Sequence, residues 1–172
     1  MEKPEKLYHA SSNRSIEQFV PRAEKVRDKT EGPRVFATPD KRMSTIFIVG
    51  TDDSWTHSGA FNGIPYVVIS DKDRFTQLDK GGAIYHLPST TFENDPEKGL
   101  GELEWTSKEV VDPTGKEEHE SALDAMVNHG VQVYFVDAET FVAINAAPDH
   151  GLSILHSLTS ENQRRGVNAV RL

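Results

Sequence analysis

The chain mixes short apolar segments that have the period of strands with longer segments that have the period of amphipathic helices. Segments rich in β-branched and aromatic residues predict strands over 6–11, 34–38, 66–70, 83–87, 104–111 and 131–136. Helical spacing of apolar residues predicts helices over 39–49, 117–128, 139–146 and 152–163, and a helical turn over 15–19. The strands cluster in the middle of the chain, with helices between and after them. This order predicts an α+β fold rather than a regularly alternating parallel sheet.

The length of 172 residues predicts a single domain over 1–172. We expect its core over about 6–136 and C-terminal helices within 137–172. Two polar loops interrupt the predicted core, one at 50–63 and an acidic one at 88–101. The first is long enough to act as a lid over a site.

Composition narrows the class of protein. Hydrophobic residues make up 36% and charged residues 27% of the chain, which is typical of a folded globular protein. The absence of cysteine excludes disulfides, thiolate metal ligands and a cysteine nucleophile. The charged N-terminus does not read as a signal peptide, and the longest apolar stretch, near 46–49, is too short to span a bilayer. We therefore expect a soluble, cytoplasmic protein without a membrane partner.

The net charge of −8 is unevenly distributed. Residues 1–42 carry 10 Lys or Arg and 7 Asp or Glu, whereas residues 43–172 carry 9 and 20. A general nucleic-acid-binding protein needs a broad cationic surface, so strong binding of this kind is not expected. A small anionic ligand held by the basic N-terminal part is compatible with this distribution, as is a simple difference between solvated faces.

The standard catalytic and nucleotide-binding motifs are absent, among them the Walker loop, the dinucleotide fingerprint, HExxH and GxSxG. The seven histidines are not paired at the spacing of metal ligands, so we predict no metal site. One candidate motif is the segment 8–11 (YHAS), which places His9 at a strand end before two small residues. Small residues let a ligand approach the backbone, and the imidazole and hydroxyl groups can hydrogen-bond a ribose or an amide.

Two further motifs follow along the chain. The segment 35–38 (VFAT) ends a strand and leads into the helix that carries Phe47. Two aromatic rings near one pocket can sandwich a planar heterocycle. The third motif is Glu104 in the late strand. Taken singly, each motif is better explained as ordinary core or surface, so the interpretation depends on their order and spacing together.

That order resembles the ADP-ribosyltransferase superfamily, in its diphtheria-toxin and poly(ADP-ribose)-polymerase branch. In that branch a first strand carries an aromatic-His-Gly-Ser type motif, which 8–11 resembles. A Tyr-Phe-Ala type strand and a helix with a second aromatic follow, similar to 35–38 and 44–47, and a late strand opens with Glu and an aromatic, similar to Glu104-Trp105. The resemblance covers roughly residues 6–136. It implies a split antiparallel or mixed β-sheet core with flanking helices.

The resemblance also implies NAD as the substrate and a role for each matching residue. The implied NAD-binding residues are Tyr8, His9, Ser11, Arg22, Phe36, Ala37, Thr38 and Phe47. His9 would bind the ribose next to the nicotinamide, Ser11 the carboxamide, and Arg22 the pyrophosphate. Phe36 and Phe47, within one residue of register, would flank the nicotinamide ring. The catalytic residues would be His9 and Glu104, with Glu109 as the alternative to Glu104, stabilising positive charge on the sugar as nicotinamide leaves.

The implied activity is therefore NAD-dependent ADP-ribosyl transfer to an unknown acceptor, which is a protein, a nucleic acid or a small molecule. An NAD-dependent RNA 2′-phosphotransferase is a variant within the same superfamily, although the acidic second half of the chain disfavours it. A module on the same fold that binds a nucleotide or a protein without turnover is a second hypothesis. An unrelated α+β interaction domain is a third.

Overall fold

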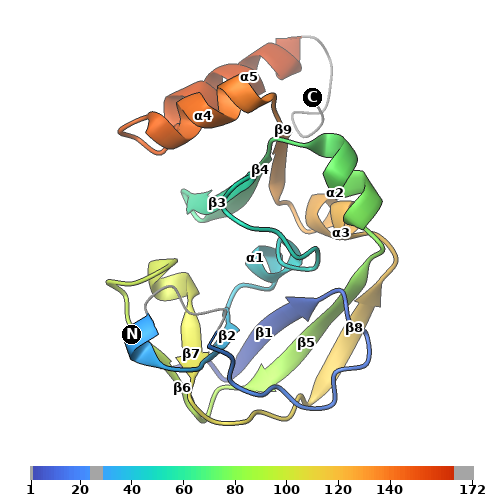
Figure 1. The fold of residues 1–172 in the computed structure, drawn as a ribbon, viewed down its shortest axis with the longest axis vertical. Coiled ribbons are helices and arrows are strands. Elements are labelled where there is room, and N and C mark those ends of the chain that lie inside the picture. Colours follow the sequence, from blue (N-terminus) through green and yellow to red (C-terminus); the bar gives the residue numbers. More distant parts are fainter. Residues whose placement is uncertain (1, 24–28, 165–172) are drawn as a thin grey trace.

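The computed structural model describes residues 2–23 and 29–164 (Figure 1). The strands are β1 (Lys6–Ser11), β2 (Val35–Ala37), β3 (Thr56–Phe61), β4 (Ile64–Ile69), β5 (Gly82–Pro88), β6 (Phe92–Asn94), β7 (Trp105–Ser107), β8 (Gly115–His119) and β9 (Gln132–Phe135). The helices are α1 (Lys41–Thr45), α2 (Lys72–Leu78), α3 (Ala122–Asn128), α4 (Ala138–Ala146) and α5 (Leu152–Arg164), with 3-10 turns η1 (Lys29–Glu31) and η2 (Gly101–Leu103). The predicted α+β class is confirmed.

The strands form three small sheets with the orders β1-β5-β8, β2-β7-β6 and β3-β4-β9. The first two sheets are antiparallel, whereas the third pairs β4 with β9 in parallel. Tyr8 and Thr38 exchange two backbone hydrogen bonds, of 2.8 and 2.9 Å, and so join β1 to β2. Figure 1 shows these two sheets together below α1, and β3-β4-β9 above it.

Three apolar clusters hold these layers together. The first packs under one face of β1-β5-β8 and β2-β7-β6 and includes Leu7, Tyr85 and Trp105. The second fills the space around α1 and α3, from Ala10 and Ile84 to Val67 and Val133 of the third sheet. The third joins that sheet to α4 and α5, which cover its far side (Figure 1). Burial of both faces explains why β4 and β9 read as continuous apolar segments.

Several predicted elements are wrong in their extent. The helix predicted over 39–49 ends at Thr45, because Ile46, Ile48 and Val49 are all buried, and one face of a helix cannot present that spacing to a core. The helix predicted over 117–128 begins only at Ala122, after its cap Ser121, because residues 115–119 pair with β5 as β8.

Other segments differ in type. The segment 15–19 forms no helical turn, and Phe19 exchanges backbone hydrogen bonds with Val111. The strand predicted over 104–111 is limited to β7, since the Glu109 amide turns back to the Ser107 hydroxyl. The loops predicted over 50–63 and 88–101 contain β3 and β6, and α2 was not predicted.

The remaining elements lie close to their predicted positions. β1 has the predicted bounds, while β4, β5, β9, α4 and α5 differ by one or two residues at an end. The end of the predicted range 137–172, beyond residue 164, lies outside the described residues. No helix in the described part of the chain is both long and apolar enough to cross a membrane.

Candidate functional site

The three strands that carry the sequence motifs lie side by side, although they are far apart in the sequence. β2 is in the middle, joined to β1 through Tyr8 and Thr38 and to β7 through the pairing of Ala37 with Trp105. Glu104 directly precedes Trp105, and Thr38 directly follows Ala37. Antiparallel pairing therefore puts Tyr8, Thr38 and Glu104 in one row across the three strands.

Four of the predicted residues share one face of these strands. Residues directly opposite in an antiparallel pair point to the same side, and side chains alternate along a strand. Leu7, Ala37 and Trp105 point into the core cluster under the sheets. The alternate residues Tyr8, Phe36, Thr38 and Glu104 therefore lie on the other face, where α1 packs. We call this the α1 face.

His9 points to the opposite side of β1, where its ring lies 4.6 Å from that of Phe19. Its Nδ1 atom is 2.6 Å from the carbonyl oxygen of Phe36. The Phe36 carbonyl points toward β1, as the carbonyl of Thr38 does. At Phe36 the two strands separate, and the imidazole of His9 bonds this carbonyl. Because a carbonyl oxygen can only accept, Nδ1 carries the proton, and in the neutral ring Nε2 is the acceptor nitrogen.

Glu104 is fixed at the start of β7. Its backbone N–H donates to the Gly101 carbonyl at 3.1 Å, and the Asn94 amide donates to the Glu104 carbonyl at 2.8 Å. The carboxylate lies against the backbone of Gly99, which has a φ of +54°, and a Cβ added there would come within 2.2 Å of Oε1. The positive φ favours glycine at this position, and any Cβ here would displace the Glu104 carboxylate. The segment before β7 therefore holds the backbone of Glu104, and its carboxylate lies close to Gly99.

The alternative residue, Glu109, has a different setting. It lines an open pocket of about 440 Å³ on the β2-β7-β6 sheet, together with Arg34, Thr106 and Lys108. Thr106 is the register partner of Phe36, so this pocket opens on the same side of the sheet as the α1 face. Glu104 is not among the residues that line it.

The other predicted residues are less close to this face. The Ser11 hydroxyl accepts a hydrogen bond from the Asn13 amide at the end of β1, and Ala37 points into the core. Arg22 is exposed and pairs with Arg34 at the start of β2. Phe47 is 42% exposed in the turn after α1, and its ring makes no contact with Phe36 among the described residues. The structure as it stands does not assemble the predicted ring sandwich.

A second polar group on the same side of β1 was not predicted. Lys41 Nζ and His86 Nε2 both donate to Glu117 Oε2, at 2.8 and 2.9 Å. The ring of Tyr8 lies beside them, 5.5 Å from Lys41 Nζ and edge-on to His86 at 5.5 Å. Tyr8, Lys41, His86 and Glu117 thus form one cluster, which we call the Tyr8 cluster.

Charge within the Tyr8 cluster is strongly paired. The hydrogen bond from Lys41 is the main reason that the pKa of Glu117 falls to about 2, with a further contribution from His86, against a smaller opposing effect of burial. The same bond raises the pKa of Lys41. The sequence gives no signal for this cluster, because it depends on the register of β8 against β5.

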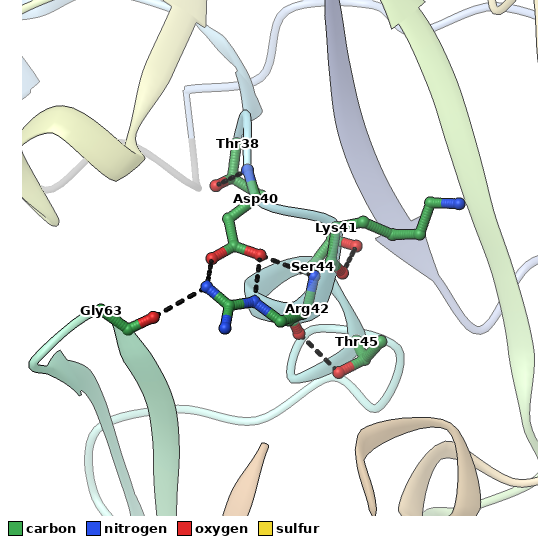
Figure 2. A network of polar contacts seen from close by, with 7 residues as sticks. All are labelled: Thr38, Asp40, Lys41, Arg42, Ser44, Thr45 and Gly63. Carbon is green, nitrogen blue, oxygen red and sulfur yellow. Dashed lines mark hydrogen bonds and ion pairs between the residues drawn. The ribbon is translucent and has the colours of Figure 1, made fainter. Parts of the chain in front are cut away.

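The start of α1 is held by a compact hydrogen-bond network (Figure 2). The Asp40 carboxylate caps the helix by accepting from the Arg42 amide, and also binds the Arg42 guanidinium at 3.0 and 2.7 Å. The same guanidinium donates to the Gly63 carbonyl at 2.7 Å, in the turn between β3 and β4. Thr38 accepts from the Asp40 amide. This network fixes α1, and with it Lys41, relative to the end of β2.

Comparison of the chain with models of known protein families, with curated proteins and with solved structures found no match. Within the described residues, no three His, Asp or Glu side chains are grouped so that they could hold a metal ion.

Proposed function

We propose that this protein transfers ADP-ribose from NAD to an acceptor. The observation that carries the proposal is the adjacency of β1, β2 and β7. The segments that resemble the three motifs of the ADP-ribosyltransferase superfamily come from distant parts of the sequence, yet they form one continuous row of strands. That row presents Tyr8, Phe36, Thr38 and Glu104 on a common face.

In the proposed reaction, the bond between C1′ of the ribose and the nicotinamide nitrogen breaks, and nicotinamide leaves with the electron pair. The acceptor then bonds to C1′ and loses a proton. Positive charge develops on the sugar during departure, so a fixed carboxylate stabilises the transition state more than the ground state. Glu104 is the candidate for this role, since its backbone is held by Asn94 and Gly101 and its carboxylate lies close to Gly99.

His9 has a positional role in this proposal. The bond to the Phe36 carbonyl orients the imidazole with Nε2 as the acceptor, which suits a ribose hydroxyl donor rather than proton transfer. The ring lies beside the point where β1 and β2 separate. A ribose that reached the imidazole would therefore lie at this separation, on the other side of β1 from the face that carries Glu104.

The test is nicotinamide release from NAD, measured by chromatography with a panel of protein, nucleic-acid and small-molecule acceptors. The wild-type protein is expected to release nicotinamide, and Glu104→Gln is expected to lose this by at least about a hundredfold. Glu118→Gln, an exposed glutamate on β8, is the matched control. Glu109→Gln decides between the two candidate carboxylates.

The outcomes separate the alternatives. Release that depends on Glu109 and not on Glu104 would move the catalytic role to the pocket beside Arg34. NAD binding without release for any acceptor would indicate a binding module. No binding of NAD or ADP-ribose at millimolar concentration would contradict the proposal and favour an unrelated interaction domain.

A further inference from the structure

Three basic residues lie side by side in a row across the strands, at the start of β2. Arg22 and Arg34 exchange two backbone hydrogen bonds, of 3.0 and 3.3 Å. The pairing of Val35 with Ser107 puts Arg34 opposite Lys108 at the next position. Residues that are directly opposite in antiparallel strands have their side chains on the same side. We call Arg22, Arg34 and Lys108 the basic row.

The basic row is not neutralised by the protein. Within the described residues, none of its three members forms an ion pair. Arg34 Nη1 donates to the neighbouring Pro33 carbonyl at 3.1 Å. Like charges that face each other across two strands are destabilising, and they are unexpected in a chain whose net charge is −8. A bound anion would remove this repulsion.

Two members of the basic row, Arg34 and Lys108, line the open pocket of about 440 Å³ on the β2-β7-β6 sheet. Carboxylates line the same pocket and limit which anion it accepts. They belong to Glu31, Glu93, Asp95 and Glu109. The ammonium of Lys98 binds Glu31 and lies 3.9 Å from the Asp95 carboxylate. Once these charges are paired, the basic row exceeds the remaining acidic residues by one charge.

Glu93 indicates what else the ligand carries. It lies on β6 opposite Thr106, which is two residues before Lys108 on β7. Glu93 and Lys108 are therefore diagonal neighbours, with backbones about 7–8 Å apart. A carboxylate only accepts hydrogen bonds, so Glu93 repels a bare phosphate but binds a hydroxyl group. A phosphate ester of a sugar presents an anion and hydroxyl donors a few ångströms apart.

We propose that this pocket binds the phosphate ester of a sugar, free or as part of a nucleotide. The phosphate lies on the basic row, where the guanidinium and ammonium groups donate charge-assisted hydrogen bonds. A sugar hydroxyl donates to Glu93. The site is assigned without reference to the position of NAD, so it goes beyond the proposed function and is tested separately from it.

The experiment is calorimetric titration with ribose 5-phosphate, AMP, ribose and inorganic phosphate. The wild-type protein should bind ribose 5-phosphate at least about tenfold more tightly than inorganic phosphate, and should not bind ribose. AMP that binds more tightly than ribose 5-phosphate would identify a nucleotide as the source of the phosphate, and equal affinities a sugar phosphate. Lys108→Met should weaken ribose 5-phosphate binding by about tenfold or more. Lys6→Met, at an exposed lysine that begins β1, is the matched control and should leave the affinity unchanged.

Thermal unfolding separates a binding role of the basic row from a structural one. Lys108→Met relieves the repulsion with Arg34, so without ligand this variant should be at least as stable as the wild-type protein. Ribose 5-phosphate should raise the Tm of the wild-type protein but not that of Lys108→Met at the same concentration. A destabilised Lys108→Met variant would show that this lysine supports the fold, and would overturn the proposal.

The ligand class has its own test. Glu93→Gln should reduce the preference for ribose 5-phosphate over inorganic phosphate, because it removes both the repulsion and the charged acceptor. An unchanged preference in this variant, or equal affinities of the wild-type protein for these two probes, would overturn the assignment of a sugar phosphate. If neither ribose 5-phosphate nor AMP binds at millimolar concentration, the site is wrong, whether or not the protein releases nicotinamide from NAD.

Discussion

The imidazole of His9 lies 2.6 Å from the carbonyl oxygen of Phe36, and this bond spans the point where β1 and β2 separate. One residue earlier, the two strands still exchange backbone hydrogen bonds through Tyr8 and Thr38. The His9 side chain therefore takes the place of the next backbone hydrogen bond between the two strands. The relationship ties the first sequence motif to the second, and it also fixes which ring nitrogen of His9 can accept a hydrogen bond.

This relationship predicts that His9 contributes to stability as well as to ligand binding. His9→Ala leaves the half-buried carbonyl of Phe36 without its partner, and should lower the free energy of unfolding by about 1–3 kcal/mol. His9→Asn places an amide N–H near the position of Nδ1 and should recover most of this loss. Urea unfolding of the two variants measures the difference. Equal destabilisation by Asn and Ala would contradict a role for the Nδ1 bond.

The same pair of variants separates structure from function. Asparagine at this position offers no group at the position of Nε2. His9→Asn should therefore lose nicotinamide release even though it is nearly as stable as the wild-type protein. A stable His9→Asn variant with full activity would show that the role of His9 is purely structural.

Gly99 and Gly101 form a matched pair for testing Glu104. Both have a positive φ, of +54° and +62°, so alanine at either position strains the backbone, at a cost of about 1 kcal/mol. Only at Gly99 does the new Cβ meet the Glu104 carboxylate, since the nearest atom at Gly101 is the Pro96 carbonyl oxygen at 3.4 Å. Gly99→Ala should reduce nicotinamide release by at least about tenfold more than Gly101→Ala does. Equal effects on nicotinamide release would contradict a catalytic role for the Glu104 carboxylate.

The Asp40–Arg42 pair should control the stability of α1. Asp40→Ala removes the helix cap and the partner of the guanidinium, and should cost about 1–2 kcal/mol. Burial alone would raise the pKa of Asp40, but the hydrogen bonds from Arg42 and its charge outweigh burial and lower it. This contribution is therefore present above the unfolded-state pKa and is lost as the pH falls through the lower folded-state pKa. Urea unfolding of wild type and Asp40→Ala between pH 2 and 6 measures it, and parallel curves would contradict the assignment.

His119 should make stability depend on pH in the mildly acidic range. Its Nε2 is buried with no hydrogen-bond partner, and its ring lies 5.9 Å from that of His129 at the end of α3. Burial and the neighbouring His129 lower its pKa, with an opposing effect of Glu117 and a further lowering by Lys41. The stability contribution is therefore complete above the unfolded-state pKa of about 6.5 and is lost as the pH falls through the lower folded-state value.

Thermal unfolding between pH 4 and 8 tests this assignment. His119→Phe should show a shallower loss of stability below pH 6.5 than the wild-type protein, because the buried ring no longer needs to be protonated. His156→Gln, a change at an exposed histidine, should leave the wild-type slope intact. A slope that is the same in His119→Phe as in the wild-type protein would contradict the assignment.

The sequence predicted the elements whose periodicity is local. β1, α4 and α5 follow from alternation, helical spacing and caps, and they lie at or within one residue of their predicted bounds. Residues 117–119 of β8 were predicted as the start of a helix, because Gly115–His119 is mostly charged and carries no strand pattern. Its conformation is set by pairing with β5, which is a tertiary effect that a local pattern does not contain.

For the candidate site, the sequence predicted which strands carry the motifs, but not the side of the sheet to which each side chain points. Tyr8 and His9 are neighbours in one motif, yet they point to opposite sides of β1, and the row across β2 pairs Tyr8 with Thr38. This depends on register, which a shift of one residue would invert. The contact between Lys41 and Glu117 could not be predicted from the sequence. It joins the start of α1 to β8, an edge strand of the β1-β5-β8 sheet.

A crystal structure of Glu104→Gln with bound NAD tests the central claim most directly, since the variant should hold the substrate without turning it over. We predict the nicotinamide ribose beside residue 104 on the α1 face. NAD bound away from β1, β2 and β7, or no bound NAD at saturating concentration, would contradict the account.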